Sequence, residues 1–108
     1  MKLIDTAGLA AAAAQFARER DWDKYHSPKN LAMALSVEAA ELVEIFQWST
    51  EAESRAVMQS DEADHVRQEL ADITIYLVQL CTVMKVDLNA AVEAKIEMNA
   101  RKYPRPSV

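Results

Sequence analysis

Apolar residues recur at helical spacing along nearly the whole chain, and this pattern predicts an all-α protein. The four main helices are expected over residues 5–20, 28–48, 61–84 and 88–102. Ser27 and Pro28 form a favourable helix start, because serine caps the first turn and proline suits the first helical position. Asp87 can cap the fourth helix, and Pro104 stops it. A polar bridge over residues 50–60, with room for a short helix, joins the second and third helices, and residues 1–108 are expected to form a single domain.

The second predicted helix carries carboxylates within its apolar stripe. With about 100° of rotation per residue, Glu38 lies between Leu42 and Ile45 on the helical wheel, in the middle of the stripe. Glu41 lies about 60° away, at the edge of the stripe. A carboxylate in apolar surroundings is costly unless it is protonated, paired with a cation or bound to a metal ion. The position of Glu38 therefore indicates one of these three states.

The third predicted helix repeats this arrangement. Glu69 is central in its apolar stripe, and Asp72 has the same offset from Glu69 as Glu41 has from Glu38. If the two helices pack antiparallel, the four carboxylates can converge, and their repulsion in a low dielectric then needs compensation. An all-oxygen ligand set suits a hard divalent cation, so the pattern favours Mg²⁺, with Mn²⁺ as the alternative. Ion pairs with lysine or arginine of the fourth helix are the competing structural explanation.

Composition narrows the classes of function. A net charge of −5 argues against a nucleic acid polymer as partner, and a single glycine leaves no glycine-rich loop for phosphate. No stretch approaches the ~20 apolar residues of a membrane span, and the Ala-rich start of the chain resembles an ordinary helix more than a signal peptide. The single Cys81 lies in an apolar run and is expected to be a buried thiol in a reducing compartment. These features predict a cytoplasmic protein without a membrane partner.

Two further groups of side chains suit a phosphate-bearing ligand. Lys95, Asn99 and Lys102 fall on one face of the fourth predicted helix, where lysine provides charge and asparagine a donor. Tyr76 lies on the carboxylate face of the third helix, and other aromatic side chains, which can stack on a base, flank the second. A solvated basic helix end and aromatic core filling are the plain structural explanations. The side chains that flank the second predicted helix are those of Trp22, Tyr25, His26 and Trp48, of which His26 is an imidazole.

Together these stretches resemble a known family. The motifs RDWDKYHSPKN, ExxELxExFQW, ExxDITIYL and KIEMNARKYP have the order and spacing of the MazG-like all-α nucleotide pyrophosphohydrolases, and they are most similar to the dCTP pyrophosphatase branch. The resemblance covers about residues 15–104. It implies Mg²⁺-dependent hydrolysis of nucleoside triphosphates, dCTP or related dNTPs in particular, to the monophosphate and pyrophosphate, for clearance of the nucleotide pool. It also implies four-helix bundle-like protomers that assemble into a homodimer or a homotetramer built as a dimer of dimers.

The resemblance assigns roles to particular residues. The implied metal ligands are Glu38, Glu41, Glu69 and Asp72. The implied pocket for base and sugar comprises Trp22, Asp23, Lys24, Tyr25, His26, Trp48 and Tyr76. The implied phosphate-binding residues are Lys95, Asn99 and Lys102. Glu41, at the edge of the stripe, is the candidate for orienting the attacking water. Val37 and Ala13 depart from residues found in some relatives, which bears on metal number and base preference.

Two other classes of protein remain open. Glu62 and His65 form an ExxH motif of the kind found in di-iron carboxylate bundles. Such a site needs two of these motifs, and the remaining His26 belongs to none. A non-catalytic helical interaction module is the other alternative, with structural salt bridges on the carboxylates and aromatic contacts to a partner helix. Release of pyrophosphate from dCTP in the presence of Mg²⁺ alone would distinguish the enzyme from the di-iron protein and from the interaction module.

Overall fold

The computed structural model describes residues 2–107, and the regular structure among them is entirely helical. The α-helices are α1 (Ala7–Glu19), α2 (Pro28–Phe46), α3 (Glu51–Arg55), α4 (Ala63–Met84) and α5 (Leu88–Lys102). Two 3-10 helices, η1 (Asp23–Tyr25) and η2 (Val57–Gln59), lie in the connections. The all-α class predicted from the sequence is confirmed.

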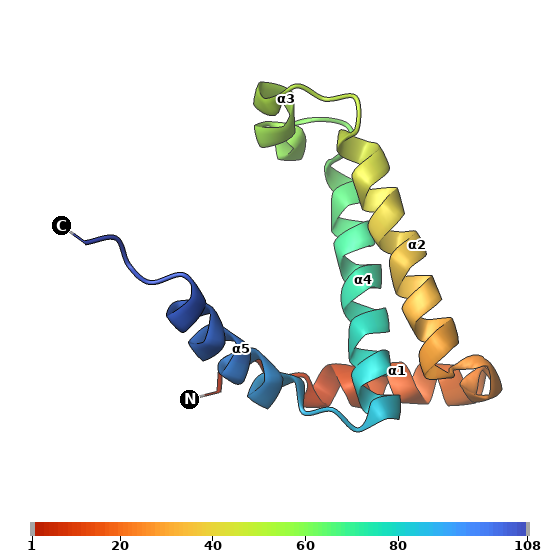
Figure 1. Ribbon diagram of the computed structural model, residues 1–108. Helices are drawn as coiled ribbons and strands as arrows, with labels where there is room; N and C mark the ends of the chain where they lie inside the picture. Colours follow the sequence, from red (N-terminus) through yellow and green to blue (C-terminus); the bar gives the residue numbers. More distant parts are fainter. Residues whose placement is uncertain (1, 108) are drawn as a thin grey trace.

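A long antiparallel pair of helices forms the body of the protein. α2 and α4 lie side by side, α1 crosses them near one end, and α3 lies at the other end (Figure 1). Leu31 of α2 is 1% exposed, and burial of a leucine side chain stabilises the fold by about 1.5–3 kcal/mol. Ala17 of α1 is equally buried, because a methyl group lets the crossing helix approach closely. The other buried apolar side chains are Ala13, Val66, Val78 and Cys81, so the predicted burial of the cysteine is confirmed.

Local capping fixes where the helices begin. The Ser27 hydroxyl accepts a hydrogen bond from the backbone N–H of Asn30 at 3.1 Å, directly before Pro28. The Asp87 carboxylate accepts one from the N–H of Ala90 at 3.0 Å, so both predicted helix starts are confirmed. The polar bridge folds into α3, which a capping box starts, and η2. The predicted ends at residues 84 and 102 are confirmed. The remaining bounds differ from the observed ones by one or two residues, since the ends of helices are weakly encoded.

The junction between α4 and α5 is a sharp turn. Lys85 adopts the left-handed conformation, with φ of 57°, and its N–H points back to the carbonyls of Cys81 and Thr82. This closes the last turn of α4 as a left-handed C-cap does. α5 then leaves at 102° to α4. No single helix of residues 2–107 is long and apolar enough to span a membrane, and the bent α4–α5 pair meets that test by length and composition only.

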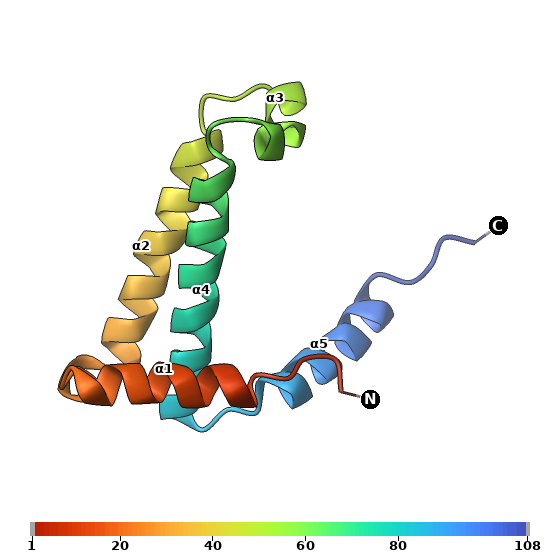
Figure 2. The same ribbon diagram turned by 180° about the vertical axis from the view of Figure 1, so that it is seen from behind.

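The fourth predicted helix does not fold back onto the body. Figure 2 shows α5 projecting outwards, and the radius of gyration is 17.0 Å, whereas a compact chain of this length has about 13 Å. Ile96 and Met98 of α5 are more than half exposed. The side chain of Asn89 accepts hydrogen bonds from the N–H groups of Leu3 and Ile4, which ties the start of the chain to α5. Within one chain, the four main helices therefore do not close into the bundle-like arrangement that the sequence suggested.

Candidate active site

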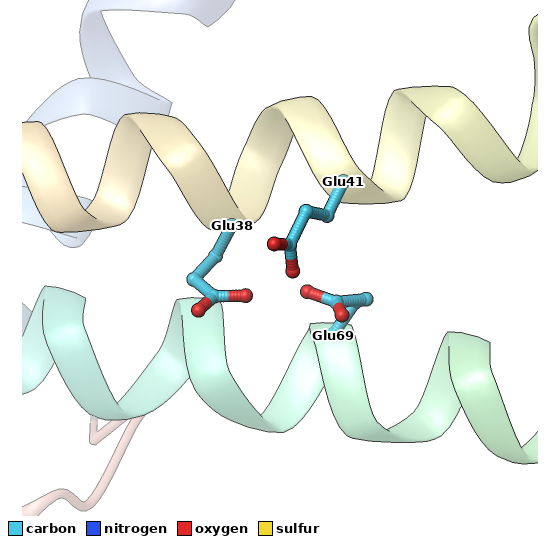
Figure 3. Close-up of side chains that lie close together, drawn as sticks. All are labelled: Glu38, Glu41 and Glu69. Atoms are coloured by element: carbon cyan, nitrogen blue, oxygen red, sulfur yellow. The ribbon is translucent and has the colours of Figure 1, made fainter.

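Three carboxylates converge between α2 and α4. Glu38 and Glu41 project from successive turns of α2, and Glu69 points towards them from α4 (Figure 3). One oxygen from each carboxylate lies within 4.8 Å of the others. The antiparallel packing that the sequence suggested therefore brings both apolar stripes, and these acids within them, face to face.

Enclosure makes this cluster electrostatically strained. Glu69 is 5% exposed, and its Oε2 and the Oε2 of Glu38 are enclosed, without a hydrogen-bond partner among residues 2–107. The pKa of Glu38 is raised from 4.5 to about 7, first by a shared hydrogen bond with Glu69, then by burial, and then by Glu41. Among the described residues, these three carboxylates have no lysine or arginine partner at ion-pair distance. Unpartnered oxygens from an all-carboxylate set fit a hard divalent cation.

His65 links the cluster to the surface of α4. Its Nε2 lies 3.4 Å from Oε1 of Glu69, and its Nδ1 lies 3.0 Å from Oε2 of Glu62. The Glu62 carboxylate is the largest cause of the raised pKa of His65. His65 thus contacts one carboxylate of the cluster. In residues 2–107 the group of three potential metal ligands contains no histidine, so the structure offers no support for the di-iron alternative.

A cavity of about 390 Å³ lies between α1 and α4. Its volume falls within the range of small-molecule sites. Trp22 and Phe16 meet edge to face in its wall, with ring centroids 5.6 Å apart. The predicted pocket residues Trp22, His26 and Tyr76 all line it. The structure therefore brings together one part of the predicted nucleoside pocket.

The cavity adjoins the carboxylate cluster. Burial raises the pKa of Tyr76 above its ordinary value, and the negative charges of Glu38 and Asp72 raise it further. Glu38 belongs to the cluster and Tyr76 to the cavity wall, so the two features share one electrostatic environment. Asp72 lies one helical turn beyond Glu69 and lines the cavity, outside the group of three carboxylates. The predicted fourth ligand is thus nearby but is not part of the observed cluster.

Some cavity residues were missed by sequence reasoning. Leu9, Ala12 and Phe16 contribute from α1, and Ile75 and Gln79 from α4. The apolar face of the first helix was visible in the sequence, but nothing there showed that this face borders a cavity. Gln79 follows Asp72 by seven residues, and this spacing places both side chains on one face of α4. That spacing was the available signal for Gln79.

Only part of the connection before α2, residues 22–26, lines the larger cavity. Asp23 lines a smaller cavity of about 180 Å³ together with His26. Lys24 forms an ion pair with Asp21 at 2.9 Å, and Tyr25 is 58% exposed. Trp22 and His26 at the two ends of the predicted segment thus line the larger cavity. Lys24 and Tyr25 line neither cavity and are exposed.

Other predicted residues lie away from the carboxylate cluster of the same chain. Trp48 follows α2 and is 88% exposed. Lys95, Asn99 and Lys102 are exposed on α5, which projects from the body (Figure 1). The fold of a single chain does not bring these four side chains to the carboxylate cluster.

The fold and the site define an all-helical protein with a cluster of three carboxylates beside an aromatic cavity. Comparison with known proteins gives the family: residues 33–107 match the MazG-like family, to which the chain belongs. Human dCTP pyrophosphatase 1 is 46% identical over 92 residues, which are 84% of this chain and 54% of that protein. The rat protein of the same name is 45% identical over the same shares. The chain thus spans about half the length of these curated relatives.

A solved structure supports the same assignment. The crystal structure of a pyrophosphatase from Archaeoglobus fulgidus superposes with a TM-score of 0.84 at 43% identity. The match covers 91% of each chain. The similarity therefore extends over most of the chain.

Proposed function

We propose that the protein is a nucleoside triphosphate pyrophosphohydrolase that uses Mg²⁺, with Mn²⁺ as a substitute, and acts on dCTP or a related deoxynucleotide. The convergence of Glu38, Glu41 and Glu69 beside the aromatic cavity carries this proposal. Two of these carboxylates have enclosed oxygens without a partner, which is the arrangement a cation relieves. The names of the relatives favour dCTP as the first substrate to test.

The protein residues divide the work of binding and hydrolysis. A bound Mg²⁺ supplies positive charge that offsets the charge of the triphosphate and promotes ionisation of the attacking water. Glu38, Glu41 and Glu69 would hold the cation, and Asp72, one turn further along α4, is proposed as an additional ligand. Glu41 is the one member of the cluster without an oxygen that is both enclosed and unpartnered. It is therefore the proposed group that orients the water and accepts its proton.

The reaction itself is a displacement at phosphorus. The water oxygen forms a bond to the α-phosphorus, and the bond from that phosphorus to the bridging oxygen breaks. Pyrophosphate leaves, and the nucleoside monophosphate remains. Trp22, with Phe16 behind it, and Tyr76 offer faces and edges against which a base and sugar can pack. His26 offers a ring nitrogen at the cavity wall for a hydrogen bond to the nucleoside.

A second protomer completes the proposed site. Trp48 and the α5 residues Lys95, Asn99 and Lys102 are exposed, and Ile96 on the same helix leaves apolar surface uncovered. We infer a homodimer or homotetramer in which these residues approach the cavity of a neighbouring copy, with the lysines on the leaving phosphates. Sedimentation equilibrium tests this assembly: a species of two or four chains is expected, and a stable 12.1 kDa monomer would contradict it.

Product analysis tests the activity. Purified protein is incubated with Mg²⁺ and each of the eight common ribonucleoside and deoxyribonucleoside triphosphates. Equal amounts of monophosphate and pyrophosphate are expected, and Glu38→Gln, which keeps the shape of the side chain, should abolish them at unchanged helix content. Diphosphate with inorganic phosphate as products, or full activity of the variant, would refute the proposal. Absence of turnover with every nucleotide would favour the non-catalytic interaction module.

A further inference from the structure

The two oxygens of Glu69 have different surroundings. Oε2 is enclosed and without a hydrogen-bond partner, and the carboxylate faces Glu38 and Glu41 across the helix pair (Figure 3). Oε1 lies 3.4 Å from Nε2 of His65. One oxygen is thus without a partner, while the other already contacts the imidazole.

The imidazole of His65 is itself held on its other side. Its Nδ1 lies 3.0 Å from Oε2 of Glu62, the residue that directly precedes α4. Glu62, His65 and Glu69 fall at i, i+3 and i+7 on one face of the helix. They form a continuous chain of contacts from the half-exposed carboxylate of Glu62 to the 7% exposed side chain of Glu69.

This chain of contacts can preorganise the cluster and so raise its affinity for a cation. A glutamate side chain has several rotatable bonds, and fixing them at the moment of binding costs conformational entropy. A contact that holds the carboxylate beforehand removes part of that cost, and outer partners of metal ligands commonly influence affinity by about 10–100-fold. We propose that His65 is a positioning residue, which holds Oε1 of Glu69 so that Oε2 stays directed at the cation, and that Glu62 orients the imidazole. This inference rests on the proposed function, because it concerns the same cation site.

α4 provides a matched comparison for this contact. Arg67 forms an ion pair with Asp64 at 2.7 Å, with side chains 62% and 86% exposed. This pair has the same i, i+3 spacing as Glu62 and His65, but neither partner belongs to the cluster. Removal of Arg67 therefore reports the general effect of losing an exposed pair from this part of the helix.

Mn²⁺ affinity measured by titration calorimetry without nucleotide tests the inference. His65→Leu is expected to weaken Mn²⁺ binding about 10-fold or more, by the usual effect of an outer partner. His65→Gln, whose amide N–H can donate to Oε1, should recover part of the loss, and Arg67→Leu should bind as the wild type does. In turnover, His65→Leu should need more Mg²⁺ but approach the wild-type kcat when Mg²⁺ is saturating, which a collapsed site would not do.

Each result separates the inference from the proposed activity. Unchanged Mn²⁺ affinity in His65→Leu, or an equal loss in Arg67→Leu, would overturn the positioning role. If His65→Leu does not fold, Glu62→Gln decides: weaker Mn²⁺ binding supports the role, and unchanged binding overturns it. A wild-type protein that binds Mn²⁺ but releases no pyrophosphate contradicts the proposed activity alone.

Discussion

Glu38→Gln should remove a pH dependence of stability from the metal-free protein. In the wild type the Glu38 carboxyl is crowded by Glu69 and Glu41, and its pKa is raised to about 7. The folded state therefore holds a proton that the unfolded chain, with a glutamate pKa near 4.5, releases more readily. Glutamine has the same shape, donates from its amide towards the neighbouring carboxylates and does not titrate.

The sign and size of the effect follow from this difference. The proton-linked stability is fully present below pH 4.5 and is lost as the pH rises through about 7. A rise of the pKa from 4.5 to about 7 corresponds to roughly 3 kcal/mol, and the partial solvent exposure of Glu38 reduces this to about 2 kcal/mol. The wild type should therefore lose about 2 kcal/mol more than Glu38→Gln does between pH 5 and pH 8.

Urea unfolding in EDTA, at fixed protein concentration and several pH values, measures this difference. The free energies of unfolding of the two proteins should diverge steadily between pH 5 and pH 8. Added Mg²⁺ should then stabilise the wild type more at pH 8 than at pH 6, because the cation requires the ionised carboxylates. Parallel pH profiles of the wild type and the variant would refute the proposed crowding of Glu38.

Three further substitutions test other parts of the site and fold. Asp72→Asn should abolish pyrophosphate release at unchanged circular dichroism, and a fully active variant would exclude Asp72 from the site. Leu31→Ala should lower the free energy of unfolding in urea by about 2–5 kcal/mol through a core cavity, whereas a loss below 1 kcal/mol would contradict its burial. Gln79→Leu should change the order of kcat/KM values among bases while Mn²⁺ affinity stays constant, since the amide lines the cavity and not the cluster. A uniform fall for all bases would indicate a purely structural role.

The fold and the cluster were predictable because short-range patterns encode them. Helical periodicity and capping residues are local, so Ser27 and Asp87 marked helix starts correctly. Glu38 and Glu69 stood out because each interrupts an apolar stripe, and antiparallel packing of the two stripes is the simplest way to bury both. The sequence therefore contained the main elements of the proposed cation site.

The arrangement of α5 and the cavity wall depended on information that the sequence does not carry locally. The direction in which α5 leaves the body is set by the left-handed conformation of Lys85, a residue without the usual signal of glycine. The cavity arises where α1 crosses α4, and a crossing point is not visible in either helix alone. Asp72 shared the spacing of Glu41, but a side chain one carbon shorter and its own position on α4 place it at the cavity instead of in the cluster.

The central claim is that Glu38, Glu41 and Glu69 together bind a divalent cation. A crystal structure of the wild-type protein grown with Mn²⁺, with data collected near the manganese absorption edge, tests this most directly. An anomalous peak between α2 and α4, within coordination distance of oxygens from all three carboxylates, is expected. Saturating Mn²⁺ with no peak at that position, or with peaks only at surface carboxylates elsewhere, would contradict the claim.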